Sequence, residues 1–90
     1  MVKASKLLQK ILSGSKNVRF DEFVRLLEAF GFRLKRITGS HHLFENSDIP
    51  DVLSIQPTKN GQVKPYQVRQ FLKLIEAYNL KLDQSDEGER

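Results

Sequence analysis

The stretch Gly31-Phe-Arg-Leu-Lys-Arg-Ile-Thr-Gly-Ser-His-His-Leu-Phe44 predicts a strand, a tight turn and a second strand. Over residues 32–35 apolar and basic side chains alternate, so we expect the apolar ones on one face of a sheet and the cations on the other. Gly39 lies between a threonine and a serine and can adopt a positive φ without a Cβ clash, which is typical of a turn. The rest of the predicted fold is arranged around this hairpin.

Helical and strand patterns flank the hairpin on both sides. Apolar residues recur at helical spacing before and after it, and a short alternating segment follows the polar loop at 46–51. The predicted elements are helices over 1–13, 19–30 and 65–80 and strands over 32–37, 41–46 and 52–56. This α-α-β-β-β-α order indicates an α+β fold, with helices packed on one face of a small three-stranded antiparallel sheet. The other face is expected to be free for a ligand.

Three residues are candidates for helix ends. Asn17 is a candidate N-cap of the second helix, Gly31 is placed to close that helix in a left-handed conformation, and Pro65 suits the first position of the last helix. We interpret the aromatic residues of the helices as core rather than as a platform for stacking bases. The predicted buried face of the last helix consists of Val68, Phe71, Leu72, Ile75 and Tyr78.

Length and composition restrict the class of protein. Ninety residues make one domain with a modest core. The chain has no cysteine, which excludes disulfides, thiolate metal sites and a cysteine nucleophile. No apolar run approaches the length of a membrane span, and lysines interrupt the apolar residues of 1–13, which argues against a signal peptide. These features favour a cytoplasmic protein.

The charge is positive and unevenly placed along the chain. The net charge is +4, although the last ten residues hold four acids, Asp83, Asp86, Glu87 and Glu89. Residues 83–90 lack apolar side chains and are predicted to form a disordered acidic tail. A small basic domain of this kind favours a polyanionic partner, most simply nucleic acid, and the alternative is that the lysines only solvate the surface.

The hairpin and its flanks carry a family resemblance. Glu28-x-x-Gly-Phe-Arg-Leu-x-Arg-x-x-Gly-Ser-His-His-x-Phe44 resembles the core motif of HicA-type toxins, also called YcfA-like mRNA interferases. Ile55-x-Pro57, followed by a basic loop and a helix, resembles the second half of that family, so the resemblance covers roughly residues 20–80. It implies a fold similar to the double-stranded RNA-binding domain, a ribonuclease activity that stops translation, and neutralisation by a HicB-type antitoxin.

The resemblance also assigns roles and shows two departures. The family's catalytic histidine directly follows Gly-Ser, which makes it His41 here, with Gly39 and Ser40 shaping the turn. Many members carry a histidine before the proline of the third strand, where this chain has Gln56. The family often begins at the second predicted helix. We therefore divide the chain into an additional helix and linker at 1–16, a HicA-like domain at 17–82 and the acidic tail at 83–90.

The chemistry of RNA cleavage suits the two histidines. RNA supplies its own nucleophile, the 2′-hydroxyl, so cleavage needs a base, charge stabilisation on the phosphate and an acid for the leaving oxygen. Imidazole suits the role of base because it titrates near neutrality, and cations stabilise the phosphate. We hypothesise that His41 is the general base, that His42 or a lysine assists, and that Arg33 and Lys35 hold the phosphate. The expected products carry a 2′,3′-cyclic phosphate and a 5′-hydroxyl.

The predicted partners are RNA, mRNA in particular, and a HicB-type antitoxin, with no membrane, no metal and no small-molecule cofactor. A metal site is not expected because adjacent histidines on a strand diverge and no third ligand lies at a suitable spacing. The lysines and arginine of 59–73 are a candidate patch for binding phosphates. The alternative interpretation is that they are an ordinary solvated helix face. The predicted RNA-binding residues are Arg33, Lys35, Arg36, Ser40, Lys59, Lys64 and Arg69.

Several alternatives stay open at this stage. His41 is either catalytic or a surface histidine that hydrogen-bonds its own turn. Strand alternation places His41 and Leu43 on one face of the strand and His42 and Phe44 on the other. His41 therefore faces outward if Phe44 faces the core, and a bulge after the turn would reverse this. The whole chain is an RNA-cleaving toxin, a nucleic-acid-binding module of the same fold without cleavage, or a domain whose basic face docks an acidic protein.

Overall fold

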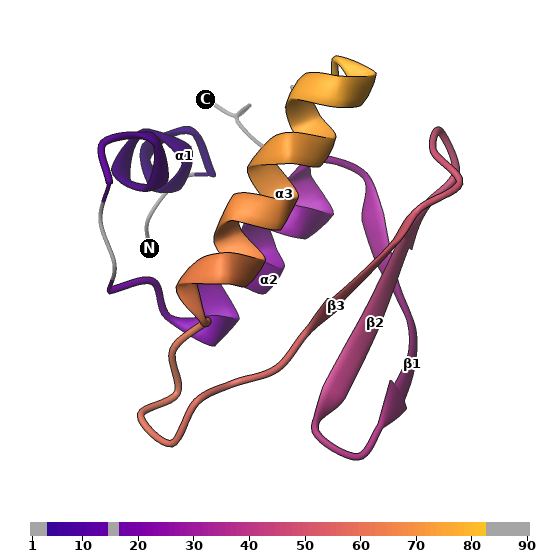
Figure 1. Ribbon diagram of the computed structural model, residues 1–90. Coiled ribbons are helices and arrows are strands. Elements are labelled where there is room, and N and C mark those ends of the chain that lie inside the picture. The colour runs from indigo at the N-terminus through magenta and orange to yellow at the C-terminus, as the bar shows by residue number, and fades with distance from the viewer. Residues whose placement is uncertain (1–3, 15–16, 83–90) are drawn as a thin grey trace.

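The computed structural model describes residues 4–14 and 17–82. The elements follow the predicted α-α-β-β-β-α order, which confirms the α+β fold class (Figure 1). The predicted tail at 83–90 and the first three residues of the predicted first helix lie outside the described residues. The helices are α1 (Ala4–Leu12), α2 (Phe20–Ala29) and α3 (Pro65–Tyr78), and the strands are β1 (Phe32–Thr38), β2 (His41–Asn46) and β3 (Val52–Ile55).

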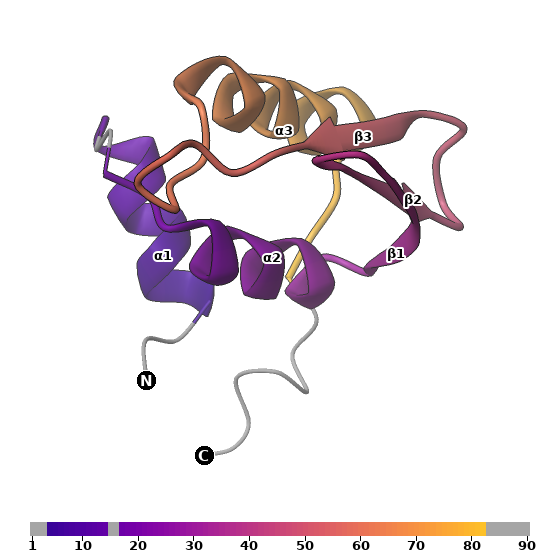
Figure 2. The ribbon, with the colours of Figure 1, turned by 90° about the horizontal axis from the view of Figure 1, so that it is seen from below.

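The three strands form one antiparallel sheet in the order β1-β2-β3, so β2 is the central strand. The helices α2 and α3 cover one face of this sheet, and α1 lies on the side of these helices away from the sheet (Figures 1 and 2). No described element covers the opposite face, which we call the outer face. It carries His41, Leu43 and Glu45 of β2, because Phe44 between them is buried toward the helices.

The chain enters α2 from an extended segment rather than from a side-chain cap. The N-cap residue is Arg19, so the prediction that Asn17 caps this helix is wrong. Arg19 pairs with Gln62 as an isolated β-bridge, and the backbone N–H of Phe20 donates to the oxygen of Gly61 at 2.8 Å. The helix therefore begins where the loop before α3 already satisfies one of its free N–H groups.

The end of α2 and the start of α3 follow the sequence prediction. Gly31 has a φ of +92°, and its N–H donates to the oxygen of Glu28 at 3.0 Å, which closes the helix before β1 begins. Pro65 occupies the first turn of α3, where its missing N–H leaves no intrahelical bond unmade.

A cluster of phenylalanines joins the helices to the sheet. The ring of Phe71 in α3 makes edge-to-face contacts with Phe23, Phe30 and Phe32, at centroid distances of 5.2, 5.4 and 6.1 Å. Such contacts add to the free energy gained by burying the rings. Phe71 is therefore the residue around which α2, α3 and β1 pack.

The helix α1 shares this core. Its apolar stripe, Ala4, Leu7 and Ile11, is buried, and α1 packs against α2. A nine-residue helix is too short to be stable alone in water. The helix thus depends on this contact, and it extends the core beyond the residues of the family motif.

The helix α3 differs from its predicted burial pattern at both ends. Tyr78 is 40% exposed and its hydroxyl donates to Asp51 Oδ1 at 3.1 Å, so its predicted place on the buried face is wrong. The hydrogen bond to the Asp51 carboxylate raises the pKa of Tyr78 above its ordinary value, and desolvation of the phenol and the negative charge of Asp51 add smaller effects in the same direction. Tyr66 is also exposed, so the interpretation of the helical aromatics as core fails for both tyrosines. Gln67, by contrast, is buried.

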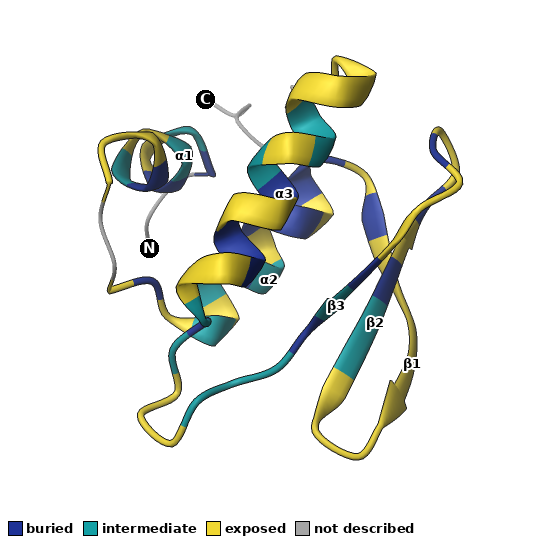
Figure 3. Ribbon diagram, in the orientation of Figure 1, coloured by how far each residue is buried: buried dark blue, intermediate teal, exposed yellow. Residues whose placement is uncertain are grey.

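The strand β1 carries a bulge. Leu34 is opposite Phe44, but the next paired residue of β1 is Arg36, opposite Leu43, so Lys35 is the extra residue. The predicted alternation of apolar and basic residues therefore holds as far as Leu34 and then changes register. Figure 3 shows that β1 is exposed along most of its length beyond Phe32.

Candidate functional site

The two histidines begin β2, directly after the hairpin turn. Gly39 in this turn has a φ of +62°, and a Cβ atom built there would meet nothing within 4 Å. The glycine is therefore required for its backbone conformation and not for space. The turn residues Gly39 and Ser40 are exposed, so they leave the approach to the histidines open.

His41 and His42 lie on opposite faces of the sheet. His41 pairs with Thr38 and is exposed on the outer face, whereas His42 pairs with Ile37 on one side and Ile55 on the other. The register between β2 and β3 is continuous, and Phe44 is 2% exposed, so the predicted strand parity is confirmed. One ligand on the outer face would therefore meet only the first of the two imidazoles.

His42 is held in place by its neighbours. Its ring makes an edge-to-face contact with Phe20 of α2 at 4.9 Å, and its Nδ1 lies 3.2 Å from the backbone oxygen of Ser40. Because a carbonyl oxygen only accepts, a neutral His42 making this bond carries its proton on Nδ1. The side chain thereby links the start of α2 to the turn that precedes His41.

The bulge in β1 decides which cation lies nearest to His41. Arg36 is opposite Leu43 on the outer face, two residues along β2 from His41. An unbroken register would place Lys35 opposite Leu43 and turn Arg36 toward the helices. The sequence did not reveal that Arg36 rather than Lys35 lies on the outer face opposite Leu43. A one-residue shift in pairing moves every later side chain of the strand to the other face.

The other two predicted cations of β1 gather around an acid. Arg33 is opposite Glu45, and Lys35 Nζ lies 3.9 Å from Glu45 Oε1. Both side chains of the Lys35–Glu45 pair are about half exposed, so the pair is solvated and weak. Glu45 is four residues from His41 along β2, whereas Leu43, the partner of Arg36, is two residues from it. Arg33 and Lys35 therefore lie further from His41 than Arg36 does.

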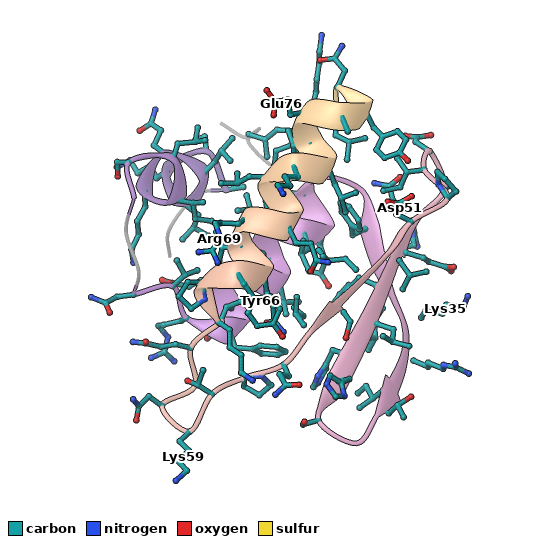
Figure 4. All side chains as sticks on the ribbon, in the orientation of Figure 1. Lys35, Asp51, Lys59, Tyr66, Arg69 and Glu76 are labelled. Atoms are coloured by element: carbon teal, nitrogen blue, oxygen red, sulfur yellow. The ribbon has the colours of Figure 1, made fainter. Side chains whose placement is uncertain are left out.

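A second group of predicted cations belongs to the loop before α3 and to α3 itself. Lys59 is exposed in a turn closed by the N–H of Gly61 donating to the oxygen of Thr58 at 3.0 Å. Lys64 is the N-cap residue of α3, and Arg69 is exposed one turn into the helix. In Figure 4 the side chain of Lys59 points away from the body of the molecule. Within the described part of the chain, none of the three cations forms an ion pair.

A buried amide connects α3 to the end of β3. Gln67 is 1% exposed, and its Oε1 accepts a hydrogen bond from the backbone N–H of Gln56 at 3.2 Å. Continuing the β2–β3 register by one residue past Ile55 places Gln56 across from His41. Sequence analysis singled out Gln56 but missed Gln67, because a glutamine within a helix gives no sign of burial.

The described residues give no support for a metal centre. Over 4–14 and 17–82, no group of three or more histidine or acidic side chains could hold a metal ion. The same part of the chain has no helix that is long and apolar enough to cross a membrane.

Comparison with known proteins agrees with the motif and the fold. The family model described as HicA toxin of bacterial toxin-antitoxin matches residues 20–77, which is more than half of the chain. The match runs from the first residue of α2 almost to the end of α3 and leaves out α1. No curated protein and no solved structure matches the chain. The family match establishes that the chain belongs to the HicA toxin family of bacterial toxin-antitoxin systems.

Proposed function

We propose that this protein is a ribonuclease that cleaves mRNA without a metal ion, with His41 as the general base. The observation that carries the proposal is the position of His41, exposed on the uncovered face of the sheet directly after the Gly39-Ser40 turn. Membership of a toxin family supports it, because HicA toxins are generally RNA-cleaving. The ribonuclease would act in the cytoplasm, where mRNA is found.

The proposed reaction uses the nucleophile that RNA already contains. His41 removes the proton of the 2′-hydroxyl, and the 2′-oxygen attacks the adjacent phosphorus. The bond from phosphorus to the 5′-oxygen breaks, and that oxygen takes a proton from an acid, which leaves a 2′,3′-cyclic phosphate and a 5′-hydroxyl. Arg36 stabilises the negative charge that develops on the phosphate.

We assign the remaining predicted residues to supporting roles. His42 lies on the opposite face and contacts Phe20, so we assign it to holding the turn rather than to proton transfer. Arg33 and Lys35 bind phosphates further along the RNA, beside Glu45, and Ser40 shapes the turn. Lys59, Lys64 and Arg69 bind the backbone from the loop and from α3, which adds affinity without sequence preference.

A HicB-type antitoxin is the partner we propose for neutralisation. The toxin must be held inactive in the cell, and the simplest way is to cover the outer face that exposes His41. The cations of β1 on that face favour an antitoxin surface that is acidic.

The test is an RNA cleavage assay in excess EDTA with the parent protein, His41→Ala and His42→Ala. We expect cleavage by the parent, loss in His41→Ala, and a smaller reduction in His42→Ala that follows its effect on folding. Loss only in His42→Ala would transfer the catalytic role to the other face. If the parent bound RNA without cleaving it, the protein would instead be a non-catalytic nucleic-acid-binding module. Its cations would still bind RNA, and Gln56, which stands where many family members have a histidine, would agree with a loss of catalysis.

A further inference from the structure

Tyr66 is an exposed aromatic side chain whose hydroxyl group is anchored by a buried residue. It is the second residue of α3 and is 52% exposed. Its hydroxyl oxygen accepts a hydrogen bond from Gln67 Nε2 at 3.4 Å, while the other end of the Gln67 amide holds the backbone of Gln56. The ring is thus tied through one buried amide to the end of β3.

The chain segments on either side of this ring carry cations. Lys64 directly precedes the helix, Lys59 lies in the loop before it, and Arg69 is exposed one turn further along α3. Figure 4 shows Tyr66 at the start of α3, between the loop that carries Lys59 and the helical turn that carries Arg69. An exposed aromatic ring in a basic segment is a combination that binds single-stranded nucleic acid, where cations hold the backbone and the ring stacks on a base.

We infer that Tyr66 stacks on an unpaired base of the RNA and that the substrate is therefore single-stranded at the cleavage site. The inference rests on the proposed ribonuclease function and extends it to the class of RNA. In a duplex the bases are stacked on each other and no ring can insert without unpairing them, whereas a single strand exposes its bases. Gln56 connects the two parts of the site: its backbone N–H donates to Gln67, the neighbour of Tyr66, and it directly follows Ile55, which pairs with His42 next to His41.

The path of the RNA follows from this arrangement. Tyr66 belongs to the helical layer and His41 to the outer face of the sheet. A strand that contacts both must pass round the end of β3, with its base on Tyr66 and its next phosphates on the outer face. A flexible single strand can follow such a path, whereas a stiff duplex pays for a sharp bend.

Tyr78 provides an internal control at the other end of α3. It is exposed to a similar degree, at 40%, but its hydroxyl donates to the carboxylate of Asp51. Figure 4 shows Asp51 and Glu76 at this end of the helix. An acidic neighbourhood repels phosphates, so Tyr78 should not contact the RNA.

The composition of the chain permits a direct measurement. It contains two tyrosines and no tryptophan, so its ultraviolet fluorescence comes from tyrosine alone. In a His41→Ala background, which prevents cleavage, adding Tyr78→Phe leaves Tyr66 as the only tyrosine, and adding Tyr66→Phe leaves Tyr78. Each protein is titrated with an eight-nucleotide single-stranded RNA of mixed sequence and with the same RNA annealed to its complement.

We expect the single strand to quench the fluorescence of the protein that retains Tyr66, and to leave that of the protein that retains Tyr78 unchanged. Tyr66→Leu should weaken binding of the single strand about tenfold, while Tyr66→Phe, which keeps a ring, should bind within about twofold of the parent. Equal quenching of both tyrosines, unchanged affinity in Tyr66→Leu, or equal quenching by the duplex would each overturn the inference.

The outcome also separates this inference from the proposed function. Quenching of Tyr66 in a protein whose parent does not cleave RNA would support the stacking role and contradict the ribonuclease. Cleavage by the parent without quenching would do the opposite. Absence of any binding to either RNA would contradict both. Because Tyr66 is exposed, its substitutions should leave the thermal unfolding temperature nearly unchanged, which checks that each variant is folded.

Discussion

The side-chain nitrogen of Asn46 donates a hydrogen bond of 3.0 Å to the backbone oxygen of Phe30, sixteen residues earlier in the chain. Asn46 is 5% exposed, and its Oδ1 accepts a second bond from the N–H of Asp48 at 2.9 Å. One buried amide therefore satisfies the end of α2 and begins the loop between β2 and β3. It also fixes the pairing of β2 with β1, since Asn46 lies opposite Phe32.

Replacing this amide should destabilise the fold. We expect Asn46→Ala to lower the free energy of unfolding by about 1–3 kcal/mol, because it leaves a buried carbonyl oxygen without its partner. The measurement is thermal or urea unfolding followed by circular dichroism. Asn60→Ala is the matched control, since Asn60 is an exposed residue of the turn before α3. If the two variants lowered the free energy of unfolding equally, the hydrogen bonds of Asn46 would contribute no more to stability than an exposed asparagine does.

The contribution of α1 to stability can be tested with two leucines of the same helix. Leu7 is 2% exposed and packs in the core, whereas Leu12 is 64% exposed. Leu7→Ala should cost about 2–5 kcal/mol in unfolding free energy, as for other buried leucines, and Leu12→Ala less than about 0.5 kcal/mol. A small effect of Leu7→Ala would mean that the domain is stable without α1, in keeping with a family match that begins at residue 20.

The hydrogen bond between Tyr78 and Asp51 predicts a dependence on alkaline pH. In a Tyr66→Phe variant the remaining tyrosine should titrate above pH 10, and adding Asp51→Asn should lower its midpoint, because the carboxylate favours the protonated phenol. Since the pKa is raised on folding, this group stabilises the fold below the unfolded value near 10, and its contribution disappears as the pH rises through the folded value. The measurement is ultraviolet absorbance of tyrosinate against pH. A midpoint insensitive to Asp51→Asn would show that the bond is absent in solution.

The local signals in the sequence predicted the elements well. The strand β2 was predicted at 41–46 and lies at His41–Asn46, and β1 and β3 differ from prediction by one residue at one end. Alternating apolar residues and a glycine in the turn determine a hairpin within a few residues of chain, so no distant contact is needed to recognise it. The same holds for Gly31 and Pro65, whose backbone preferences act locally.

The errors come from contacts between distant segments. Asn17 had the right chemistry for a cap, but pairing of Arg19 with Gln62 moved the start of α2 past it. The burial of Gln67 was missed and Tyr78 was wrongly placed on the buried face, because the burial of each depends on where the end of β3 and Asp51 lie. The bulge at Lys35 contains no glycine to mark it, and it results from the pairing of two whole strands. Each of these features requires the tertiary structure.

The bulge gives the sharpest test of the proposed site, because it assigns different roles to adjacent cations. Arg36 is opposite Leu43, two residues from His41, whereas Lys35 forms an ion pair with Glu45. Arg36→Gln and Lys35→Gln each remove one positive charge, so general attraction to RNA falls equally in both. We expect Arg36→Gln to lower the cleavage rate at saturating RNA by about tenfold or more, because it removes stabilisation of the reacting phosphate, and Lys35→Gln to lower it less than about twofold. Single-turnover cleavage of a defined RNA measures both rates. Equal losses would indicate that the two cations act only by attracting RNA, and a larger loss in Lys35→Gln would mean that β1 pairs without the bulge when RNA is bound.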